Sequence, residues 1–292
     1  MTWHLLPQFL VSGITNGSIY ALIALGFCLI QNATGIVNFA QGDFVMLGAM
    51  IAISLQLADL PLPVAFAGAI AAVAIIGVAL QQGPIRHSRN QDVLTLVMIT
   101  VGASISFHGA GMLIWGKNAG TLPALGGDTP IFLLNAAILP QTIWILVISI
   151  ITLGLLHLFF HRTLLGKAIR AAADNPFGAV LIGISVRRLV ALAFALSGAL
   201  GALAGILITP ITSMSYDGGL MLGLKGFAGA ILGGYGSTLG AVVGGLLLGI
   251  LESLGAGFIS SAYKDAIACV VLLGILFLRP AGLFGSVRVR RL

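Results

Sequence analysis

Three polar side chains stand close together in an otherwise apolar stretch, Thr34 to Met50 (TGIVNFAQGDFVMLGAM). They are Asn38, Gln41 and Asp43. Amides and a carboxylate can hold a polar solute through hydrogen bonds, but the chain shows no set of nucleophile, base and acid suited to hydrolysis. No spacing of cysteines or histidines indicates a metal site. The stretch therefore points to the passage of a solute rather than to an enzyme.

The composition predicts that these polar groups lie in a membrane. Of the 292 residues, 59% are hydrophobic and only 8% are charged, whereas soluble proteins carry about 25% charged residues. Only helices or a closed barrel can span lipid, because backbone groups there must be satisfied internally. The apolar runs are long and continuous rather than alternating, which favours helices of roughly 20 residues.

We expect one transmembrane domain over residues 1–292: an all-α, polytopic helical membrane protein of about 8–9 transmembrane helices, with broken or re-entrant segments. Nine crossings fit if the N-terminus lies outside, and eight fit if it lies inside and the second span is re-entrant. The candidate spans are Gln8–Ile30, Ile36–Leu57, Pro61–Leu80, Val93–Trp115, Ile138–Phe160, Leu189–Thr209, Leu220–Tyr235, Thr238–Phe258 and Ala266–Leu278.

The basic residues gather in three segments, which are predicted to be cytoplasmic because loops on that side carry more Lys and Arg. This clustering explains the net charge of +6 better than nucleic acid binding does. The segments around Asp59, 117–128 and Asp217 have few basic residues and are expected outside. The basic residues of the three segments are Arg86, Arg89, Arg162, Lys167, Arg170, Arg187, Arg188, Arg279, Arg288, Arg290 and Arg291.

The polar stretch is expected to be a broken helix. Steps of about 100° place Asn38 and Gln41 on roughly one face and Asp43 on another, so one continuous helix would turn one of them toward lipid. Gly42 is a natural point of interruption, and Asp43 could then cap a half-helix that starts at Phe44. Such breaks line translocation paths in transporters. Alternatively, the three side chains simply satisfy one another inside the bundle.

Other ionisable residues inside apolar runs are further candidates for the path, because such residues are costly in a membrane and commonly functional. Lys225 lies in a short, Gly-rich run from Gly219 to Ser237, which again suggests a broken or re-entrant element. Glu252 and His108 also qualify. The alternatives are snorkelling for Lys225, and a buried, neutral, hydrogen-bonded state for Glu252 and His108. The many GxxxG spacings, such as Gly13–Gly17 and Gly245–Gly249, indicate close helix packing within the bundle.

A predicted helical hairpin occupies the cytoplasmic segment 161–188. Lys167 to Ala173 favours a helix, Asn175–Pro176 interrupts it, and a second short helix from Phe177 to Ile182 could end at Gly183. Such a short, basic hairpin could lie on anionic lipid or dock against a cytoplasmic partner. The residues alone do not choose between these two.

Five motifs together resemble the integral-membrane permease subunits of bacterial ABC importers for branched-chain amino acids. The resemblance covers nearly the whole chain. In the first motif, Gln and Asp stand where the family has His and Glu. The motifs are NFAQGD (Asn38–Asp43), GKAIRAAADNP (Gly166–Pro176), LIGI (Leu181–Ile184), AILGGYGSxxGA (Ala230–Ala241) and LRPAGLFG (Leu278–Gly285).

The resemblance implies a subunit that binds no cofactor itself, with ATP bound by partner subunits. Those partners are a second homologous permease, two cytoplasmic ATP-binding subunits and an extracytoplasmic solute-binding protein, in the inner membrane of a bacterium. Leucine, isoleucine and valine are the expected solutes; relatives in the superfamily move urea, short amides or sugars. A secondary transporter that titrates Glu252 or Asp43 is the competing class. The resemblance also assigns ATPase coupling to Gly166, Lys167, Arg170, Asp174, Asn175, Pro176 and Gly183.

Overall fold

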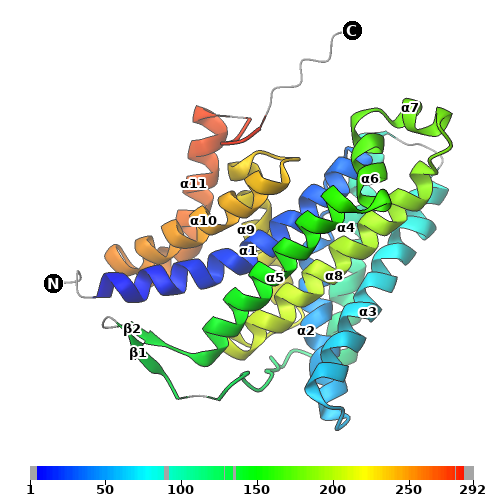
Figure 1. The fold of residues 1–292 in the computed structure, drawn as a ribbon. Helices are drawn as coiled ribbons and strands as arrows, with labels where there is room; N and C mark the ends of the chain where they lie inside the picture. Colours follow the sequence, from blue (N-terminus) through cyan, green and yellow to red (C-terminus); the bar gives the residue numbers. More distant parts are fainter. Residues whose placement is uncertain (1–4, 89–91, 128, 134–135, 280, 286–292) are drawn as a thin grey trace.

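A computed structural model describes residues 5–88, 92–127, 129–133, 136–279 and 281–285. Arg89, Arg288, Arg290 and Arg291, which the sequence predicts to be cytoplasmic, and Pro280 of the last motif lie outside these residues. The described chain is built almost entirely of helices (Figure 1). They are α1 (Leu6–Thr34), α2 (Gln41–Leu57), α3 (Leu62–Leu80), α4 (Val93–Trp115), α5 (Pro140–Arg162), α6 (Leu164–Asp174), α7 (Pro176–Leu181), α8 (Val186–Thr212), α9 (Gly218–Gly233), α10 (Thr238–Phe258) and α11 (Lys264–Leu278).

The predicted helical membrane fold is confirmed. Within the described part of the chain, six helices are long and apolar enough to cross a membrane: α1, α3 with the π-helical turn that follows it, α4, α5, α8 and α10. Two further apolar helices, α2 and α9, have only 17 and 16 residues. These two are the segments in which the sequence predicts breaks, so the short helices coincide with the polar stretches.

One span begins later than the sequence predicts. The segment before α5 forms a two-stranded antiparallel hairpin, β1 (Ile131–Leu133) with β2 (Ala136–Ile138), so the helix starts at Pro140 rather than Ile138. Proline suits the first turn of a helix, where its missing N–H costs no hydrogen bond. The amide of Gln8 on α1 bonds to both the N–H and the carbonyl of Ala137. This contact ties the β-hairpin to the start of α1.

Helix α1 lies at the centre of the bundle. Within an 18-residue apolar stretch of α1, 89% of the residues are buried, against 17–22% in the corresponding stretches of α3, α4 and α5. The exposed apolar side chains of those three outer helices, such as Ile75, Ile105 and Ile150, are available to lipid. Helices α3, α4 and α5 therefore lie at the outside of the bundle, and its interior is formed mainly by α1, α2 and α8.

Glycines let α1 and α10 approach closely. Added to Gly17, a Cβ atom would lie 2.8 Å from the Cα of Leu246; added to Gly13, it would lie 2.8 Å from the Cα of Ile250. On the other side of the contact, Gly249 packs against the backbone of Gly17. These GxxxG glycines thus serve packing within one chain, as the sequence indicates.

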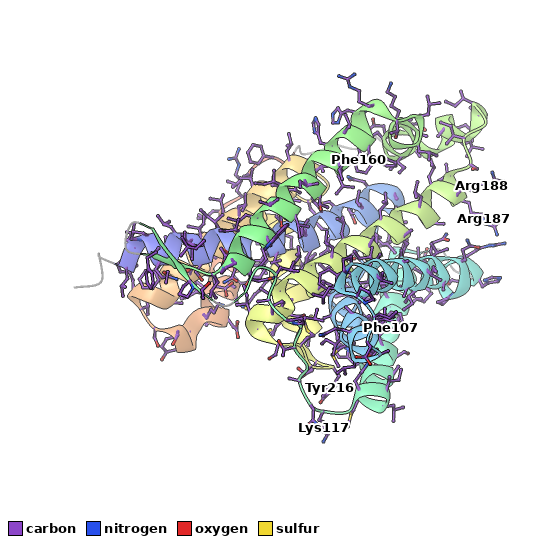
Figure 2. The ribbon with its side chains drawn as sticks, turned by 60° about the horizontal axis from the view of Figure 1, so that its bottom comes forward. Phe107, Lys117, Phe160, Arg187, Arg188 and Tyr216 are labelled. Atoms are coloured by element: carbon purple, nitrogen blue, oxygen red, sulfur yellow. The ribbon has the colours of Figure 1, made fainter. Side chains whose placement is uncertain are left out.

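The basic hairpin and the loop around Lys117 lie at opposite ends of the bundle. Figure 2 shows Arg187 and Arg188 at one end, and Lys117 and Tyr216 at the other. The hairpin α6–α7 projects at the first end (Figure 1). This separation is what the positive-inside rule requires if that end faces the cytoplasm.

We expect Gly17→Leu to lower the stability of the protein by about 1–3 kcal/mol, because the added side chain would overpack the contact between α1 and α10. Gly102→Leu on α4 is the matched control, since a Cβ atom there meets no heavy atom within 4 Å. The difference in melting temperature is measured by heating both variants in detergent and monitoring the loss of the monodisperse chromatographic peak. Equal melting temperatures would show that the α1–α10 contact does not depend on glycine.

Candidate functional site

The chain is interrupted between α1 and α2, but not at the residue that the sequence predicts. Helix α1 ends at Thr34, where Gly35 takes a left-handed conformation with φ of 75°, and α2 starts at Gln41. The break therefore spans residues 35–40, and the prediction of a break at Gly42 is wrong. Gly42 is needed for packing instead, because a Cβ atom there would lie 2.5 Å from the carbonyl oxygen of Gly219.

The predicted capping role of Asp43 is also wrong. Asp43 lies in the first turn of α2, whose N-cap is Ala40. Its Oδ1 is 3.0 Å from Nδ1 of His108 on α4, and the same nitrogen is 3.0 Å from the carbonyl oxygen of Ser104. Asp43 is almost fully buried. The structure thus brings two predicted path residues from different helices together as an acid–imidazole pair, which can share a proton or hold a polar solute.

Asn38 lies in the break and forms hydrogen bonds with the residues at the start of α2. Its Oδ1 accepts a hydrogen bond from the N–H of Ala40 at 3.2 Å, and its carbonyl oxygen accepts from the N–H of Gln41. Its Nδ2 is buried without a hydrogen-bond partner. An unmade buried hydrogen bond costs about 1–3 kcal/mol. This donor is therefore free to bond a ligand or water.

The side-chain amide of Gln41 takes part in a group of polar contacts that connects three helices. Its Nε2 donates to the carbonyl oxygen of Ser197 on α8 at 3.2 Å, and the hydroxyl of Ser197 donates to its Oε1. The same hydroxyl lies 2.9 Å from the carbonyl oxygen of Gly26 on α1. Both polar atoms of the Gln41 side chain are thus satisfied by protein, although by Ser197 rather than by Asn38 or Asp43.

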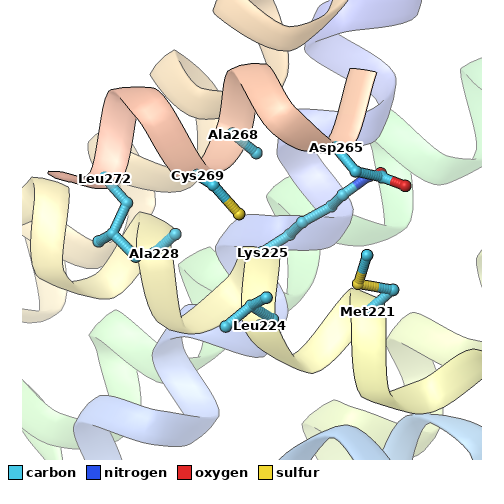
Figure 3. Close-up of a pocket in the computed structure, with 8 residues that line it drawn as sticks. All are labelled: Met221, Leu224, Lys225, Ala228, Asp265, Ala268, Cys269 and Leu272. Atoms are coloured by element: carbon cyan, nitrogen blue, oxygen red, sulfur yellow. The ribbon is translucent and has the colours of Figure 1, made fainter. Parts of the chain in front are cut away.

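Lys225 and Glu252 form a second polar group, on α9 and α10. Nζ of Lys225 lies 2.9 Å from Oε1 of Glu252 and 2.7 Å from Oδ1 of Asp265 on α11. Figure 3 shows the lysine extending under α11 toward Asp265. Nζ of Lys264 is 3.3 Å from the same Glu252 oxygen, and Nζ of Lys225 is 5.8 Å from the ring centre of Tyr20. Two lysines and two carboxylates leave this group electrically neutral.

Packing of α2 against α9 connects the two polar groups. Gly42 meets Gly219 and Gly223 at backbone distance. Phe39, in the break, lies 6.2 Å from Phe227 on α9 between ring centres, and its side chain is 46% exposed. The break therefore reaches the surface beside α9. The residue of α9 that it contacts, Phe227, follows Lys225 by two positions.

The predicted hairpin is confirmed as α6 and α7. The hydroxyl of Thr163 caps α6 by accepting from the N–H of Gly166, and Oδ1 of Asn175 caps α7 by accepting from the N–H of Gly178. Pro176 takes the first position of α7. After α7, Gly183 adopts a φ of 83°. The local sequence thus dictates both the break and the end of the hairpin.

Gly166 fixes the hairpin to α5, because a Cβ atom there would lie 2.6 Å from the Cα of Phe160. The side chains of Lys167, Arg170, Asp174 and Asn175 are exposed. Beside them is an exposed apolar surface on the hairpin, which we call the hairpin patch. It consists of Leu164, Leu165, Phe177, Val180, Leu181 and Ile182.

Some polar residues of the interior carry no clear signal in the sequence. Ser197 and Gln141 are buried, and Gln141 bonds both the N–H of Leu125 and the carbonyl oxygen of Leu207. Serine and glutamine at helix positions are too common to single out. Lys264 and Asp265 could have been found, because they are charges that directly precede the last apolar run.

Comparisons with known proteins agree on one family. The model of the family described as "Branched-chain amino acid transport system / permease component" matches residues 9–276. The permease protein BraD of the high-affinity branched-chain amino acid transport system of Pseudomonas aeruginosa is 33% identical, over 99% of this chain and 98% of that protein. The corresponding LivH of Escherichia coli K12 is 31% identical, over 97% of both chains.

More distant relatives match as well. The ribose import permease protein RbsC of Escherichia coli K12 is 27% identical, over 88% of this chain and 80% of that protein. A chain of the solved structure of PsaBC from Streptococcus pneumoniae in complex with Fab has a TM-score of 0.54, with 13% identity, over 96% of this chain and 93% of that one. The likeness to the PsaBC chain concerns the fold alone. On the family model and the near-complete alignments, the chain is a multi-pass membrane protein that belongs to the branched-chain amino acid transport system permease family.

Proposed function

We propose that this chain forms one half of the translocation path of an ABC importer for leucine, isoleucine and valine in the cytoplasmic membrane of a bacterium. A second, homologous permease would complete the path, two ATP-binding subunits would power it, and an extracytoplasmic solute-binding protein would deliver the solute. The observation that carries the proposal is the α6–α7 hairpin, which projects from the basic end of the bundle with an apolar surface uncovered.

The hairpin patch is suited to docking a cytoplasmic protein. Phe177, Leu181 and Ile182 are each at least 72% exposed, and exposed apolar groups that gather among polar ones mark interaction sites. Lys167 and Arg170 lie beside them and can pair with acidic groups of a partner. Gly166, Asp174, Asn175, Pro176 and Gly183 would act by shaping the hairpin, through the packing, capping and turn described above.

The path would use the two polar groups at the break and on α9. Asn38, Gln41, Asp43 and His108 form the first group, and Lys225 with Glu252 forms the second. A zwitterionic amino acid carries one negative and one positive group, and the unpaired Nδ2 of Asn38 and the carboxylate of Asp43 supply one partner for each. In an alternating mechanism these groups must bind the solute less tightly when the path faces inward.

The similarity to a ribose import permease supports a second candidate, in which the solute is another small polar molecule such as urea, a short amide or a sugar. A secondary transporter remains the alternative that needs no ATPase. Both alternatives differ from the main proposal in a measurable way, namely in the solute that is moved or in the energy source that moves it.

We expect the affinity-tagged chain to co-purify with an ATPase, and to take up leucine into proteoliposomes only when ATP is supplied to the ATPase side. A panel of leucine, urea, acetamide and ribose, each with the solute-binding protein, identifies the solute. Uptake that continues without ATP, driven by a proton gradient, would refute the proposal in favour of a secondary transporter. Uptake of ribose but not of leucine would show that the solute is a sugar, while the proposal of an ATP-driven importer would stand.

We expect Arg170→Glu to weaken the coupling of ATP hydrolysis to transport, because it places a negative charge beside the hairpin patch. Solute-stimulated ATPase activity should fall roughly fivefold, as for the loss of about 1 kcal/mol of binding, while the amount of inserted protein stays unchanged. Lys117→Glu makes the same charge change at the opposite end of the bundle and should have no effect. Equal solute-stimulated ATPase activity in wild type and Arg170→Glu would show that Arg170 takes no part in coupling.

We expect Asn38→Leu to slow transport by roughly tenfold, equivalent to about 1.4 kcal/mol, because it removes the free Nδ2 donor while keeping the number and branching of the side-chain non-hydrogen atoms. Stability should fall by only about 1 kcal/mol through the lost bond to Ala40. Gln141→Leu is the matched control: it removes a buried amide whose bonds lie within the protein, so it should lower the melting temperature more than the transport rate per folded complex. Normal transport by folded Asn38→Leu complexes would assign Asn38 a structural role only.

A further inference from the structure

A cavity of about 390 Å³ lies between α1, α5, α6 and α10, at the basic end of the bundle. Its lining comes from α1, α5 and α10, and from α6, the first helix of the hairpin. The path residues discussed above do not line it. Its lining residues are Leu25, Leu29, Asn32, Leu153, Gly154, Leu156, His157, Phe160, His161, Ile169, Arg170, Ala173, Thr238, Leu239 and Val242.

The lining is ordered from apolar to polar along each of the three long helices. On α1, Leu25 and Leu29 precede Asn32, which lies about 10 Å nearer to the basic end than Leu25. On α5 the leucines 153 and 156 precede His157 and His161, with Phe160 between the two histidines. On α10, which runs the opposite way, Thr238 lies nearer to the basic end than Val242. The same gradient on three helices fits a ligand with a polar head at the basic end and an apolar tail deeper in the membrane.

The polar part of the cavity favours a negative charge. Arg170 supplies a permanent positive charge, and the two stacked rings of His157 and His161, with centres 4.1 Å apart, supply further N–H donors. None of the described residues that line the cavity is acidic. Asn32 already donates its Nδ2 to the carbonyl oxygen of Gly236, and Nδ1 of His161 lies 2.9 Å from the carbonyl oxygen of His157. Arg170, the other ring nitrogens of the two histidines and the hydroxyl of Thr238 are therefore the groups left to meet the head.

The cavity opens at the surface of the described chain, beside α5 and α10. Gly154 and His157 on α5 are exposed, and so is Leu239 on α10. Beyond the opening, α5 presents Leu155 and Leu158 at its surface. The volume is within the range of roughly 300–1,000 Å³ typical of small-molecule pockets. It can hold a head group and the start of an acyl chain, and the rest of the chain would follow the apolar surface of α5.

We infer that this cavity binds an anionic phospholipid from the cytoplasmic leaflet, with its phosphate on Arg170 and the histidines and one acyl chain along α1 and α5. Basic pockets between transmembrane helices on the cytoplasmic side bind such head groups. Free phosphate shares the charge but not the tail, and it would leave the leucine-lined part of the cavity without a ligand. Because Ile169 and Arg170 belong to α6, the lipid would also hold the hairpin against the bundle.

Native mass spectrometry of the full chain, in the assembly in which it leaves the membrane, tests the inference. We expect wild type to retain about one phosphatidylglycerol per chain after extensive detergent washing. Gly154→Phe should abolish retention by filling the cavity; a Cβ atom at Gly154 meets no heavy atom within 4 Å, so the fold should tolerate the change. Arg170→Gln should weaken binding about fivefold, the effect of one basic residue near an anionic lipid.

Two matched variants serve as controls. Gly102→Phe adds the same bulk on α4, where a Cβ atom also meets nothing, and Arg162→Gln removes a charge at the same end but outside the cavity lining. Both should retain the lipid. Retention of phosphatidylglycerol by Gly154→Phe, equal binding of phosphatidylcholine, displacement of the lipid by excess inorganic phosphate, or absence of bound lipid from the wild-type assembly would each overturn the inference. None of these results depends on transport, so they leave the proposed function untouched.

Discussion

The close approach of α1 to α10 is the contact on which the rest of this structure depends. Lipid is as apolar as leucine, so helices in a membrane gain little from burying leucine and must associate through tight backbone packing. Gly13 and Gly17 on α1, with Gly245 and Gly249 on α10, provide it. With α1 held at the centre, the chain that follows its end at Thr34 folds back into the bundle: Gly35 is exposed, but Ile36, Asn38 and Ala40 are buried.

That turn explains how so many polar groups are tolerated inside an apolar chain. A break exposes backbone groups that lipid cannot satisfy, so it survives only where protein or a wet cavity surrounds it. Gln41 and Ser197 meet this need by bonding across α1, α2 and α8. The charges on α9, α10 and α11 meet it differently, by balancing two lysines with two carboxylates. Within the break itself, Nδ2 of Asn38 is buried without a partner, and an unpaired buried group calls for an explanation other than stability.

The sequence predicts the helices well and their interruption less well. Val93–Trp115 and Thr238–Phe258 agree at both ends, because long apolar runs flanked by polar residues leave little choice. The break is displaced from Gly42 to residues 35–40, because a glycine can serve either a turn or a close approach, and only the position of α9 decides between them. For the same reason, the pairings of Asp43 with His108 and of Lys225 with Asp265 could not be predicted, since they join helices that are distant in sequence.

The arrangement also suggests how a movement of the hairpin would reach the break. Helix α8 begins directly after the hairpin, at Val186. Eleven residues further along it, about 16 Å away, Ser197 accepts a hydrogen bond from Gln41 at its carbonyl oxygen, and its hydroxyl lies between Oε1 of Gln41 and the carbonyl oxygen of Gly26. A helix transmits displacement along its axis because its backbone bonds are internal. A push on α6 and α7 would therefore shift the start of α2 relative to α1, at the point where Asn38 holds its unpaired donor. In the proposed transport cycle, the amide of Gln41 would serve to couple α8 to the break, because both ends of that amide bond to Ser197.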